Sequence, residues 1–515
     1  MGLARVVRAT LLVVMATVLA GTAQADFSAE AHAPFVAINQ GSCRYDSLTA
    51  AVMAAQPGDT LFISPGTWPG SVTIDKDLTL RGGYGALCTV AGSGTTTLSG
   101  MGSQVINVIA GRVELADLVL TDGEATFGAA LRAINGSQVI LNHTLITGNR
   151  AIDRGGGVFI DDNARVTFTN DSDITENRAQ TRGGGLFISP GGFAVLHAGS
   201  DLVGNATYGA QGGGGAWVGG TLVLEDGAIT GNRAPNGGGI TVMGQGSAPA
   251  QVTLRHTQVT GNVTATDVGH GGGVLVADAT LRLEHSLVQS NTAARGGGIA
   301  VAGASAVTLT NNLVTGNLAA ASSAGGALDL TDNSAALVQQ NTISTNGAQA
   351  IVAWQPTNSL QLANNVIWGH AQGSVTTTGG SVSAACNDTE FGPLAGPGNI
   401  AANPRFVAPL DHNYRLRNDS PALDRCAAAP TAYDLDRRPR PQGAASDMGA
   451  YEGVGCPADI NQDGRIDLRD VQLVAGHFEV VPTYDGVWDY DVVQNGVVEV
   501  QDIAVVAALW GRYCW

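Results

Sequence analysis

The stretch I-T-G-N-R-A-I-D-R-G-G-G-V-F-I, from Ile146 to Ile160, decides the fold of this 515-residue chain. It joins an apolar-x-x-Asn unit to a glycine cluster and a short apolar run, and the pattern recurs from Leu145 to Asn346. Successive asparagines of the units are 26 to 30 residues apart, at Asn149, Asn177, Asn205, Asn232, Asn262, Asn291, Asn317 and Asn346. A near-constant period of this length is typical of a solenoid that stacks one repeat on the next.

Each period holds three short β-prone runs, such as Val158–Ile160, Arg165–Thr169 and Asp173–Thr175, separated by glycine, asparagine and aspartate turns. Three strands per period predict one coil of a parallel β-helix, whose coils stack about 4.8 Å apart. We expect the asparagines to bond backbone groups of neighbouring coils as a ladder and the glycines to supply positive φ at the corners. The sequence therefore predicts an all-β rod of roughly ten coils.

The first 25 residues have the pattern of a secretory signal peptide. Arg5 and Arg8 precede the apolar run Leu11–Ala20, and Ala23-Gln24-Ala25 is a cleavage site of the A-x-A type. No later apolar run approaches the ~20 residues that span a bilayer. We expect a mature protein that is secreted, extracellular or held at the cell surface, with no transmembrane segment.

The chain is acidic, with a formal net charge of −17 and Lys76 as its only lysine. This charge disfavours nucleic acid as a partner, because binding to phosphates needs a basic surface. The six cysteines fit an oxidising compartment. Pairing in sequence order, one of several connectivities that six cysteines permit, predicts the disulfides Cys43–Cys88, Cys386–Cys426 and Cys456–Cys514.

The N-terminal segment after the signal peptide predicts an amphipathic helix at Asp46–Ala55, capped by Asp46 or Ser47. The helix is followed by P-G-D-T (57–60), P-G-T-W (65–68) and L-T-L-R-G-G-Y (78–84). This order resembles the start of right-handed β-helices of the pectin-lyase-like superfamily. The resemblance implies a right-handed, single-stranded parallel β-helix whose open first coil is covered by the helix.

The segment Asn403–Glu452 resembles the conserved tail of choice-of-anchor Q proteins. The matching pieces, in order, are N-P-R-F-V (403–407), Y-R-L (414–416), S-P-A-L-D (420–424), D-L-D-R-R-P-R-P (434–441) and D-M-G-A-Y-E (447–452). The resemblance implies a β-helix end-cap without a chemical activity. We therefore divide the mature chain into an N-terminal cap with the first coils (26–100), the repeats (101–402), an end-cap and linker (403–455) and a C-terminal module (456–515).

The C-terminal module contains D-I-N-Q-D-G-R-I-D-L-R-D at residues 459–470. Oxygen donors fall at loop positions 1, 3, 5, 9 and 12, and Gly464 stands where the chain turns sharply. Such a loop is of the EF-hand type and predicts Ca²⁺ as the cofactor. The expected ligands are Asp459, Asn461, Asp463, the Arg465 carbonyl, Asp467 and Asp470.

Residues 456–515 resemble a type I dockerin, which implies a small α-helical domain of two calcium loops and a cohesin-like protein partner. A helix is expected at Val471–Phe478. The second loop aligns with fewer donors, because Val493 at position 3 offers no side-chain oxygen, and we expect it to bind calcium weakly or not at all. Its ligands would be Asp491, Asn495, the Val497 carbonyl, Glu499 and Asp502.

In dockerins the residues at loop positions 10 and 11 help to recognise the partner, and here they are Leu468 and Arg469. The second loop has Val500 and Gln501 at these positions. The alternative is a calcium-stabilised tail that has no partner.

Catalytic motifs of pectin-lyase-like enzymes are matched only in part. Polygalacturonases combine N-T-D, D-D, G-H-G and R-I-K, and this chain has only D-D at Asp161–Asp162 and G-H-G around His270. These two pieces are about four coils apart in the expected rod. Asp161, Asp162 and His270 are therefore the catalytic candidates, and a non-catalytic protein is the favoured interpretation.

Two series of arginines recur with the repeat. Arginines directly precede glycine triplets at Arg154, Arg182 and Arg295, and others directly follow a ladder asparagine at Arg150, Arg178 and Arg233. They could contact an anionic glycan or pair with acidic residues of adjacent turns, and pairing is favoured.

The sequence thus predicts an exported, non-catalytic β-helix scaffold, similar to an adhesin. Its long surface would contact a polysaccharide or a protein, and its calcium-dependent module would dock it. The alternative is a dockerin-bearing polysaccharide lyase or glycoside hydrolase.

Overall fold

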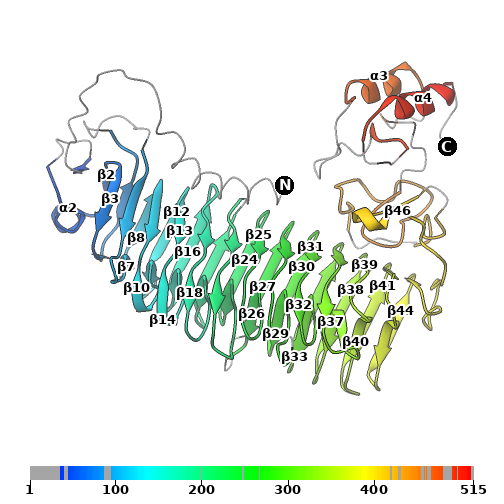
Figure 1. Ribbon diagram of the computed structural model, residues 1–515, viewed down its shortest axis with the longest axis horizontal. Helices are drawn as coiled ribbons and strands as arrows, with labels where there is room; N and C mark the ends of the chain where they lie inside the picture. The colour runs from blue at the N-terminus through cyan, green and yellow to red at the C-terminus, as the bar shows by residue number, and fades with distance from the viewer. Residues whose placement is uncertain are drawn as a thin grey trace. The chain divides into compact units, whose positions relative to one another are not determined.

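The computed structural model of the chain (Figure 1) describes residues 35–39, 44–85, 94–197, 199–245, 249–265, 267–417, 420–426, 431–453, 458, 460, 466–478, 490–493, 495 and 497–511. The chain divides into two compact units. One is His32–Ala401, and the described residues of the other lie between 402 and 511. Among the described residues, no helix is both long enough and apolar enough to cross a membrane.

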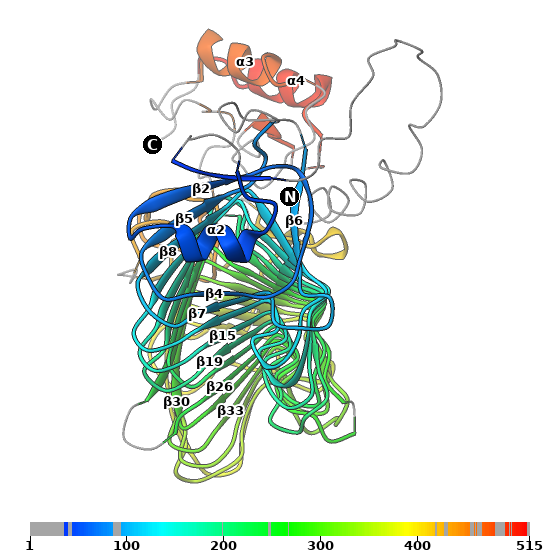
Figure 2. The ribbon, with the colours of Figure 1, turned by 90° about the vertical axis from the view of Figure 1, so that its left-hand side faces the viewer.

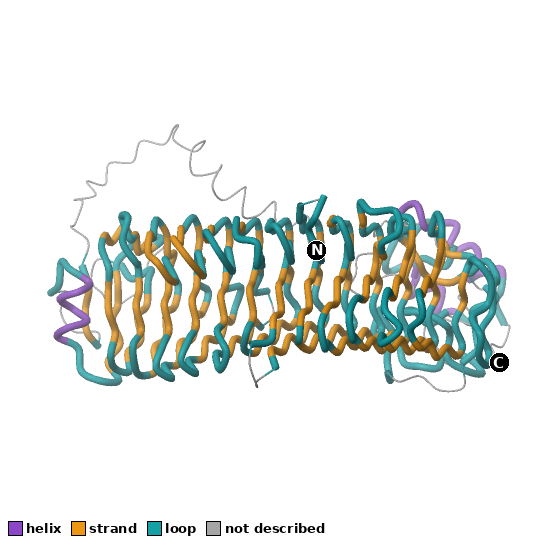
Figure 3. The backbone as a smooth tube through the Cα atoms, turned by 90° about the horizontal axis from the view of Figure 1, so that it is seen from below, coloured by secondary structure: helices purple, strands orange, loops and turns teal. Residues whose placement is uncertain are grey.

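The unit His32–Ala401 is a parallel β-solenoid, with three strands in most coils (Figure 3). Three long sheets, named A, B and C, run along it; within the described residues they contain 14, 13 and 12 strands, slightly more than ten coils require. Sheet A contains β1 (Val36–Ile38), β2 (Asp59–Ile63), β5 (Leu78–Arg81), β8 (Arg112–Ala116), β12 (Gln138–Asn142), β16 (Arg165–Thr169), β20 (Phe193–Leu196), β24 (Thr221–Glu225), β27 (Ala250–Arg255), β30 (Ala279–Glu284), β34 (Ala306–Thr310), β38 (Ala335–Gln339), β41 (Ser359–Ala363) and β44 (Ser381–Ala385).

Sheet B contains β3 (Gly66–Pro69), β6 (Thr96–Ser99), β9 (Leu118–Thr121), β13 (Leu145–Thr147), β17 (Ile174–Thr175), β21 (Leu202–Val203), β25 (Ala228–Thr230), β28 (Gln258–Thr260), β31 (Leu287–Gln289), β35 (Leu313–Thr315), β39 (Thr342–Ser344), β42 (Val366–Trp368) and β45 (Asp388–Thr389). Sheet C contains β4 (Val72–Ile74), β7 (Ile106–Val108), β11 (Leu131–Ala133), β15 (Val158–Ile160), β19 (Leu186–Ile188), β23 (Ala216–Val218), β26 (Ile240–Met243), β29 (Val274–Ala277), β33 (Ile299–Ala302), β37 (Gly325–Leu330), β40 (Gln349–Ala353) and β43 (Gly373–Thr377). Shorter strands at the corner between sheets B and C are β10 (Glu124–Phe127), β14 (Arg150–Arg154), β18 (Arg178–Ala179), β22 (Ala206–Thr207), β32 (Thr292–Ala293) and β36 (Leu318–Ala319).

The core of the solenoid follows from alternating side chains. In β16, Val166 and Phe168 are buried while Arg165 is exposed, which is the period-two pattern of a strand with one face against a core. Parallel neighbours keep the same register, so that Val139, Val166 and Ala194 stack on successive coils. The inward side chains of the three sheets form one continuous hydrophobic cluster.

The predicted asparagine ladder forms at the corner that follows sheet B. Each N–H donates to the side-chain oxygen of the asparagine one coil on, at 2.9 to 3.1 Å from Asn149 to Asn346. At its end the Asn346 N–H donates to His370 Nδ1 instead. A second ladder, which the repeat pattern did not reveal, precedes sheet B in the later coils and runs through Asn312, Asn341, Asn365, Asn387 and Asn399.

Helix α2 (Leu48–Ala54) forms where the sequence predicted a helix, and the Ser47 side chain accepts a hydrogen bond from the Ala50 N–H. Figure 2 shows the helix lying across the first coils, and Leu48, Ala51 and Val52 are buried in the solenoid core.

The second unit contains a hairpin of β46 (Phe406–Ala408) and β47 (Asn413–Leu416), joined through the 3-10 helix η1 (Pro409–Asp411). It also contains helices α3 (Leu468–Ala475) and α4 (Val500–Ala508). Helix α3 begins three residues earlier than predicted, because the Asp467 carboxylate accepts the Arg469 N–H and caps the first turn.

Candidate functional site

The repeat aligns one position of successive coils directly before the glycine clusters that lead into the strands of sheet C. Parallel bridges join Arg154 to Arg182 and His270 to Arg295. Between these pairs, the Gly213 N–H donates to Asn236 O and the Gly237 N–H donates to His270 O, so the row is continuous. We call Arg154, Arg182, His270 and Arg295 the arginine column.

A stack of aromatic rings lies on the outer side of sheet C, separate from the solenoid core. The ring centroids of Phe127 and Phe159 are 5.1 Å apart, those of Phe159 and Phe187 are 5.1 Å apart, and those of Phe187 and Trp217 are 4.8 Å apart. The stack follows from register, because Phe159, Phe187 and Trp217 are direct partners on adjacent strands. Such cross-strand aromatic pairs stabilise the sheet and give this face a rigid surface.

Arginines of the column lie over aromatic rings. The Arg154 guanidinium is 5.4 Å from the Phe187 ring centroid, Arg182 is 4.9 Å from that of Trp217, and Arg295 is 4.4 Å from that of Trp354. Contact with a ring favours a guanidinium both through its charge and through its planar shape. The rings therefore fix the direction in which these guanidinium groups present their N–H donors.

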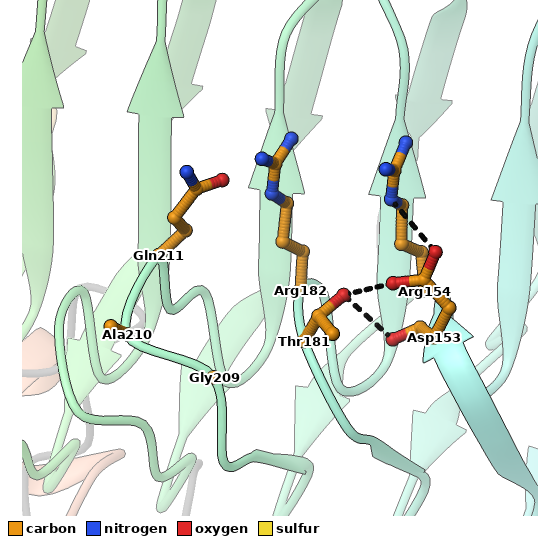
Figure 4. A pocket seen from close by; sticks show the side chains of 7 residues that line it. All are labelled: Asp153, Arg154, Thr181, Arg182, Gly209, Ala210 and Gln211. Atoms are coloured by element: carbon orange, nitrogen blue, oxygen red, sulfur yellow. Dashed lines mark hydrogen bonds and ion pairs between the residues drawn. The ribbon is translucent and has the colours of Figure 1, made fainter.

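A pocket of about 260 Å³ opens beside the first two arginines (Figure 4). Its walls are Asp153, Arg154, Thr181, Arg182, Gly209, Ala210 and Gln211. The Thr181 hydroxyl donates to Asp153 Oδ1 and to its backbone oxygen, and Asp153 Oδ2 lies 3.3 Å from Arg154 Nε. The Asp153 carboxylate is thus already in contact with other residues of the pocket wall. Figure 4 shows the two guanidinium groups side by side on adjacent coils, with Gln211 on the next coil.

The pocket holds two like charges that are partly buried. Burial, and then the positive charge of Arg154, lower the pKa of Arg182, whereas Asp153 acts in the opposite direction. Within the described part of the chain, no acidic side chain pairs with Arg182, and the buried Arg154 Nε has no hydrogen-bond acceptor. Two cations of the same column therefore lie close together with donors to spare.

A second charged group lies further along the arginine column. The Asp329 side chain is 1% exposed, accepts hydrogen bonds from Trp354 Nε1 and the Gly325 N–H, and lies 3.3 Å from Arg295 Nη2. Burial raises the pKa of Asp329, which these donors oppose. His270 is half-buried, and burial together with Arg295 lowers its pKa. A neutral imidazole, a guanidinium and a buried carboxyl group are therefore gathered around one part of the column.

The other catalytic candidates lie elsewhere. Asp161 and Asp162 follow the C-terminal end of β15, whereas His270 precedes β29, four strands along sheet C. Asp161 accepts a hydrogen bond from the Ser189 hydroxyl, and Asp162 is exposed in a turn with a φ of 51°. The structure therefore does not bring the D-D pair and His270 together, as their separation in sequence predicted.

The sequence analysis missed Trp217, Asp329 and Trp354. Only the register of sheet C shows that Asp329 occupies the outward position that holds Phe159, Phe187 and Trp217 in earlier coils. The available signal was an acidic residue inside an apolar run, A-L-D-L at 327–330.

The recurring arginines divide into two classes. Arg150 pairs with Glu124 at 2.8 Å and Arg295 pairs with Asp329, both across adjacent coils as the favoured interpretation required, whereas Arg154 pairs with Asp153, its neighbour in the sequence. For Arg178, Arg182 and Arg233, no acidic partner exists among the described residues. Pairing with adjacent turns therefore accounts for only part of the two series.

The C-terminal loops repeat one arrangement. Asp470 accepts hydrogen bonds from the Ile460 and Asp467 N–H groups, and 32 residues later Asp502 accepts from the Val493 and Glu499 N–H groups. Both carboxylates are fully buried. The bond to Ile460 is made from loop position 2 and that to Val493 from position 3, so the two loops differ at this contact.

The described loop residues carry oxygen atoms, which are the type of ligand that a hard cation prefers. The Asn495 side chain donates to Glu499 Oε1, and Asp491 Oδ1 accepts the Asn495 N–H, so these oxygen-bearing groups already lie close together. No group of three or more histidine, cysteine or acidic side chains in the described part of the chain is arranged to hold a metal ion. Four predicted ligands lie outside the described residues, namely Asp459, Asn461, Asp463 and Arg465.

The predicted partner-binding residues are at the surface. Leu468 and Val500 are the first residues of α3 and α4, and they are 51% and 65% exposed. Arg469 is also exposed. Cys386 and Cys426, the two cysteines among the described residues, are both disulfide-bonded, whereas the predicted pairs Cys43–Cys88 and Cys456–Cys514 lie outside those residues.

Comparison with known proteins supports the fold and assigns no function to the site. The family model described as "Right handed beta helix region" matches residues 269–389. No curated protein matches the chain, and no solved structure matches it either. The matched residues include β29 to β45, with three stacked strands in most coils. Topology and family match together identify the solenoid as a right-handed parallel β-helix.

Proposed function

We propose that this chain is an exported β-helix scaffold that binds an anionic polysaccharide along the two arginine series of its repeat and docks through its calcium-dependent C-terminal module. The observation that supports glycan binding is the presence of unpaired arginines in an acidic protein. Arg178, Arg182 and Arg233 have no acidic partner in the described residues, although the chain carries a net charge of −17. Unneutralised cations on rigid strands attract a polyanion and hold it through charge-assisted hydrogen bonds.

Glycan binding is tested by co-sedimentation of the full-length protein with polygalacturonate, a sulfated glycan and a neutral glucan at low and high salt. We expect retention of the two polyanions, weakened by salt because the contacts are electrostatic. The double substitution R178Q/R233Q should weaken retention several-fold, whereas R165Q on sheet A should not. Equal retention of the neutral glucan would contradict the proposal.

Docking is supported by the repeated exposure of an apolar residue at the first position of two helices, Leu468 in α3 and Val500 in α4. Contiguous exposed apolar patches mark interaction sites, and the two helices that carry these residues contact each other. Calcium bound by the first loop would order the segment that precedes α3. A pull-down with the full-length protein and its L468E/V500E variant, with calcium and with a chelator, tests the idea. Loss of the captured partner in the variant and in the chelator arm is the expected result.

An enzyme is the second candidate, favoured by the neutral His270 beside Arg295 and Asp329. A polysaccharide lyase or hydrolase needs such a base or acid near a bound anionic sugar. Product release from pectin and uronate substrates, abolished by H270A, would support it and would contradict the non-catalytic scaffold.

A further inference from the structure

We infer that the pocket between Arg154 and Arg182 is a binding site for a single oxyanion group, a carboxylate or a sulfate, carried on the ligand. The inference rests on the proposed function for the identity of the larger ligand. In this inference the pocket recognises one charged group of the ligand. The electrostatic attraction of a polyanion to the whole face would not require such a pocket.

The first argument is charge. Two guanidinium groups stand on adjacent coils, and burial, followed by the positive charge of Arg154, lowers the pKa of Arg182. An anion bound between the two guanidinium groups would attract both of them and so offset their mutual repulsion. The nearby carboxylate of Asp153 does not supply this charge fully, because it is bound by the Thr181 hydroxyl and leaves the Arg154 Nε without a hydrogen bond.

The second argument is preorganisation. Arg154 lies over Phe187 and Arg182 lies over Trp217, and these two rings stack on each other with an interplanar angle of 7°. The rings bear on one face of each guanidinium, so the side chains lose little further freedom when they bind a ligand. A planar fork held in this way suits the two oxygens of a carboxylate or two oxygens of a sulfate.

The third argument is space. The pocket floor is formed by Gly209 and Ala210, which leave the volume of about 260 Å³ open. Gly209 passes so close to the neighbouring coil that a Cβ there would lie 2.2 Å from Thr181 O, so a larger residue cannot replace it without a shift. The Gln211 side chain at the next coil adds an amide that can donate to the same anion (Figure 4).

The test is calorimetric titration of the full-length protein with sodium sulfate, D-glucuronate and glucose at low ionic strength. We expect the two oxyanions to bind and glucose not to bind. R182M keeps an apolar side chain over Trp217 but removes the charge, and it should weaken binding about tenfold or more. The matched control is R165M, because Arg165 also lies over a ring, 4.9 Å from that of Phe193 on sheet A, but does not line this pocket, and the variant should bind as the wild type does.

A second variant guards against a folding defect in R182M. A210E leaves both arginines in place and adds a carboxylate at an exposed position of the pocket floor, so it should abolish oxyanion binding while the melting temperature stays unchanged. Wild-type affinity in R182M, or an equal loss in R165M, would overturn the inference. Retention of polygalacturonate without any binding of glucuronate or sulfate would overturn it while leaving the proposed function intact. Binding of glucuronate without retention of any polyanion would contradict the proposed function and leave this inference intact.

Discussion

At the scale of single residues, the solenoid depends on buried side-chain amides whose hydrogen-bond partners are fixed. Asn262 is fully buried; its N–H and Nδ2 bind Asn291 Oδ1, its Nδ2 also binds Ile229 O, and its Oδ1 accepts from Asn232. Each asparagine satisfies backbone groups that the corner would otherwise leave unpaired in the interior. The ladder is therefore a requirement of the turn geometry.

Replacing Asn262 by alanine should destabilise the solenoid by about 2–4 kcal/mol, because several buried donors and acceptors lose their partners at once. Urea unfolding followed by circular dichroism measures the loss. The control is N135A, at an exposed turn where the amide makes one hydrogen bond to Ile109 O, and it should cost well under half as much. Equal effects of the two substitutions would argue against a special role for the ladder.

His370 ends the first ladder and makes it sensitive to acid. Its Nδ1 accepts the Asn346 N–H, and its Nε2 faces Ile343 O, so the neutral tautomer fits and a second proton would oppose the Asn346 N–H. Burial lowers its pKa below the ordinary value of 6.5, although its backbone partners and Glu390 act against the shift. The unfolded chain therefore binds a proton before the folded one does, and stability falls as the pH drops below about 6.5.

H370N should restore an amide to the ladder and remove this source of acid sensitivity. We expect the fall in melting temperature between pH 7.5 and pH 5 to be smaller in the variant than in the wild type. H143N, at an exposed histidine that pairs with Asp117, is the control and should leave the fall unchanged. If H370N melts with the wild-type pH profile, the titration of His370 does not limit stability.

At the scale of elements, the segment 434–452 of the second unit holds a dense set of buried charges. Arg440 and Glu452 form a fully buried ion pair, and Asp447 accepts the Asp424 and Gly453 N–H groups. Burial, reinforced by the charge of Glu452, raises the pKa of Asp447 to about 7. The backbone donors limit the rise but do not cancel it.

The raised pKa means that folded Asp447 still holds a proton that the unfolded chain has lost above its ordinary pKa of 3.8. Stability contributed by this group is present at low pH and is lost as the pH rises through the window up to about 7. We expect the second unit to be less stable at pH 8 than at pH 5, by roughly 1–3 kcal/mol from this group. D447N should flatten the profile in scanning calorimetry, whereas D332N, at a surface turn of the solenoid, should not.

At the scale of the whole molecule, the two units differ in what stabilises them. The solenoid has a continuous core along its coils, whereas the core that involves α3 and α4 has, among the described residues, six buried members, namely Ala458, Ile466, Val474, Val492, Val498 and Val506. So small a core rarely stabilises a domain without a metal or a cross-link. The predicted calcium loops, which precede α3 and α4 in the sequence, are where such support would come from.

Removal of calcium with a chelator should therefore lower the melting of the second unit by about 10 °C or more and leave the solenoid transition in place. Scanning calorimetry of the full-length protein resolves the two. D470N should reproduce the chelator effect, because Asp470 is a predicted calcium ligand whose buried carboxylate also accepts the Ile460 and Asp467 N–H groups. Excess magnesium should not rescue the chelated protein. A chelator effect on the solenoid alone would contradict the assignment.

The period of the sequence was enough to predict the solenoid and the ladder from Asn149 to Asn346, and the amphipathic pattern of residues 46–55 was enough to predict the helix at Leu48–Ala54, because each depends on local pattern and spacing. The second ladder was missed, since its members occur in only the later coils. For the site, the arginine series was visible, but its aromatic supports were not. Whether Arg182 pairs with an acid or lies over Trp217 depends on side chains that are one coil apart in space and more than 30 residues apart in sequence.

The sequence by itself determined that the chain is a parallel β-helix, because a constant period with asparagine and glycine at fixed positions fits few other folds. Tertiary structure alone decided which outward side chains meet. Stacking at one register brings Phe159, Phe187 and Trp217 together and places Arg154 beside Arg182, and it separates Asp161 from His270. The physical reason is that the core fixes the inward residues of every coil, whereas the outward ones are free to differ and acquire a role only from their neighbours on the coils above and below.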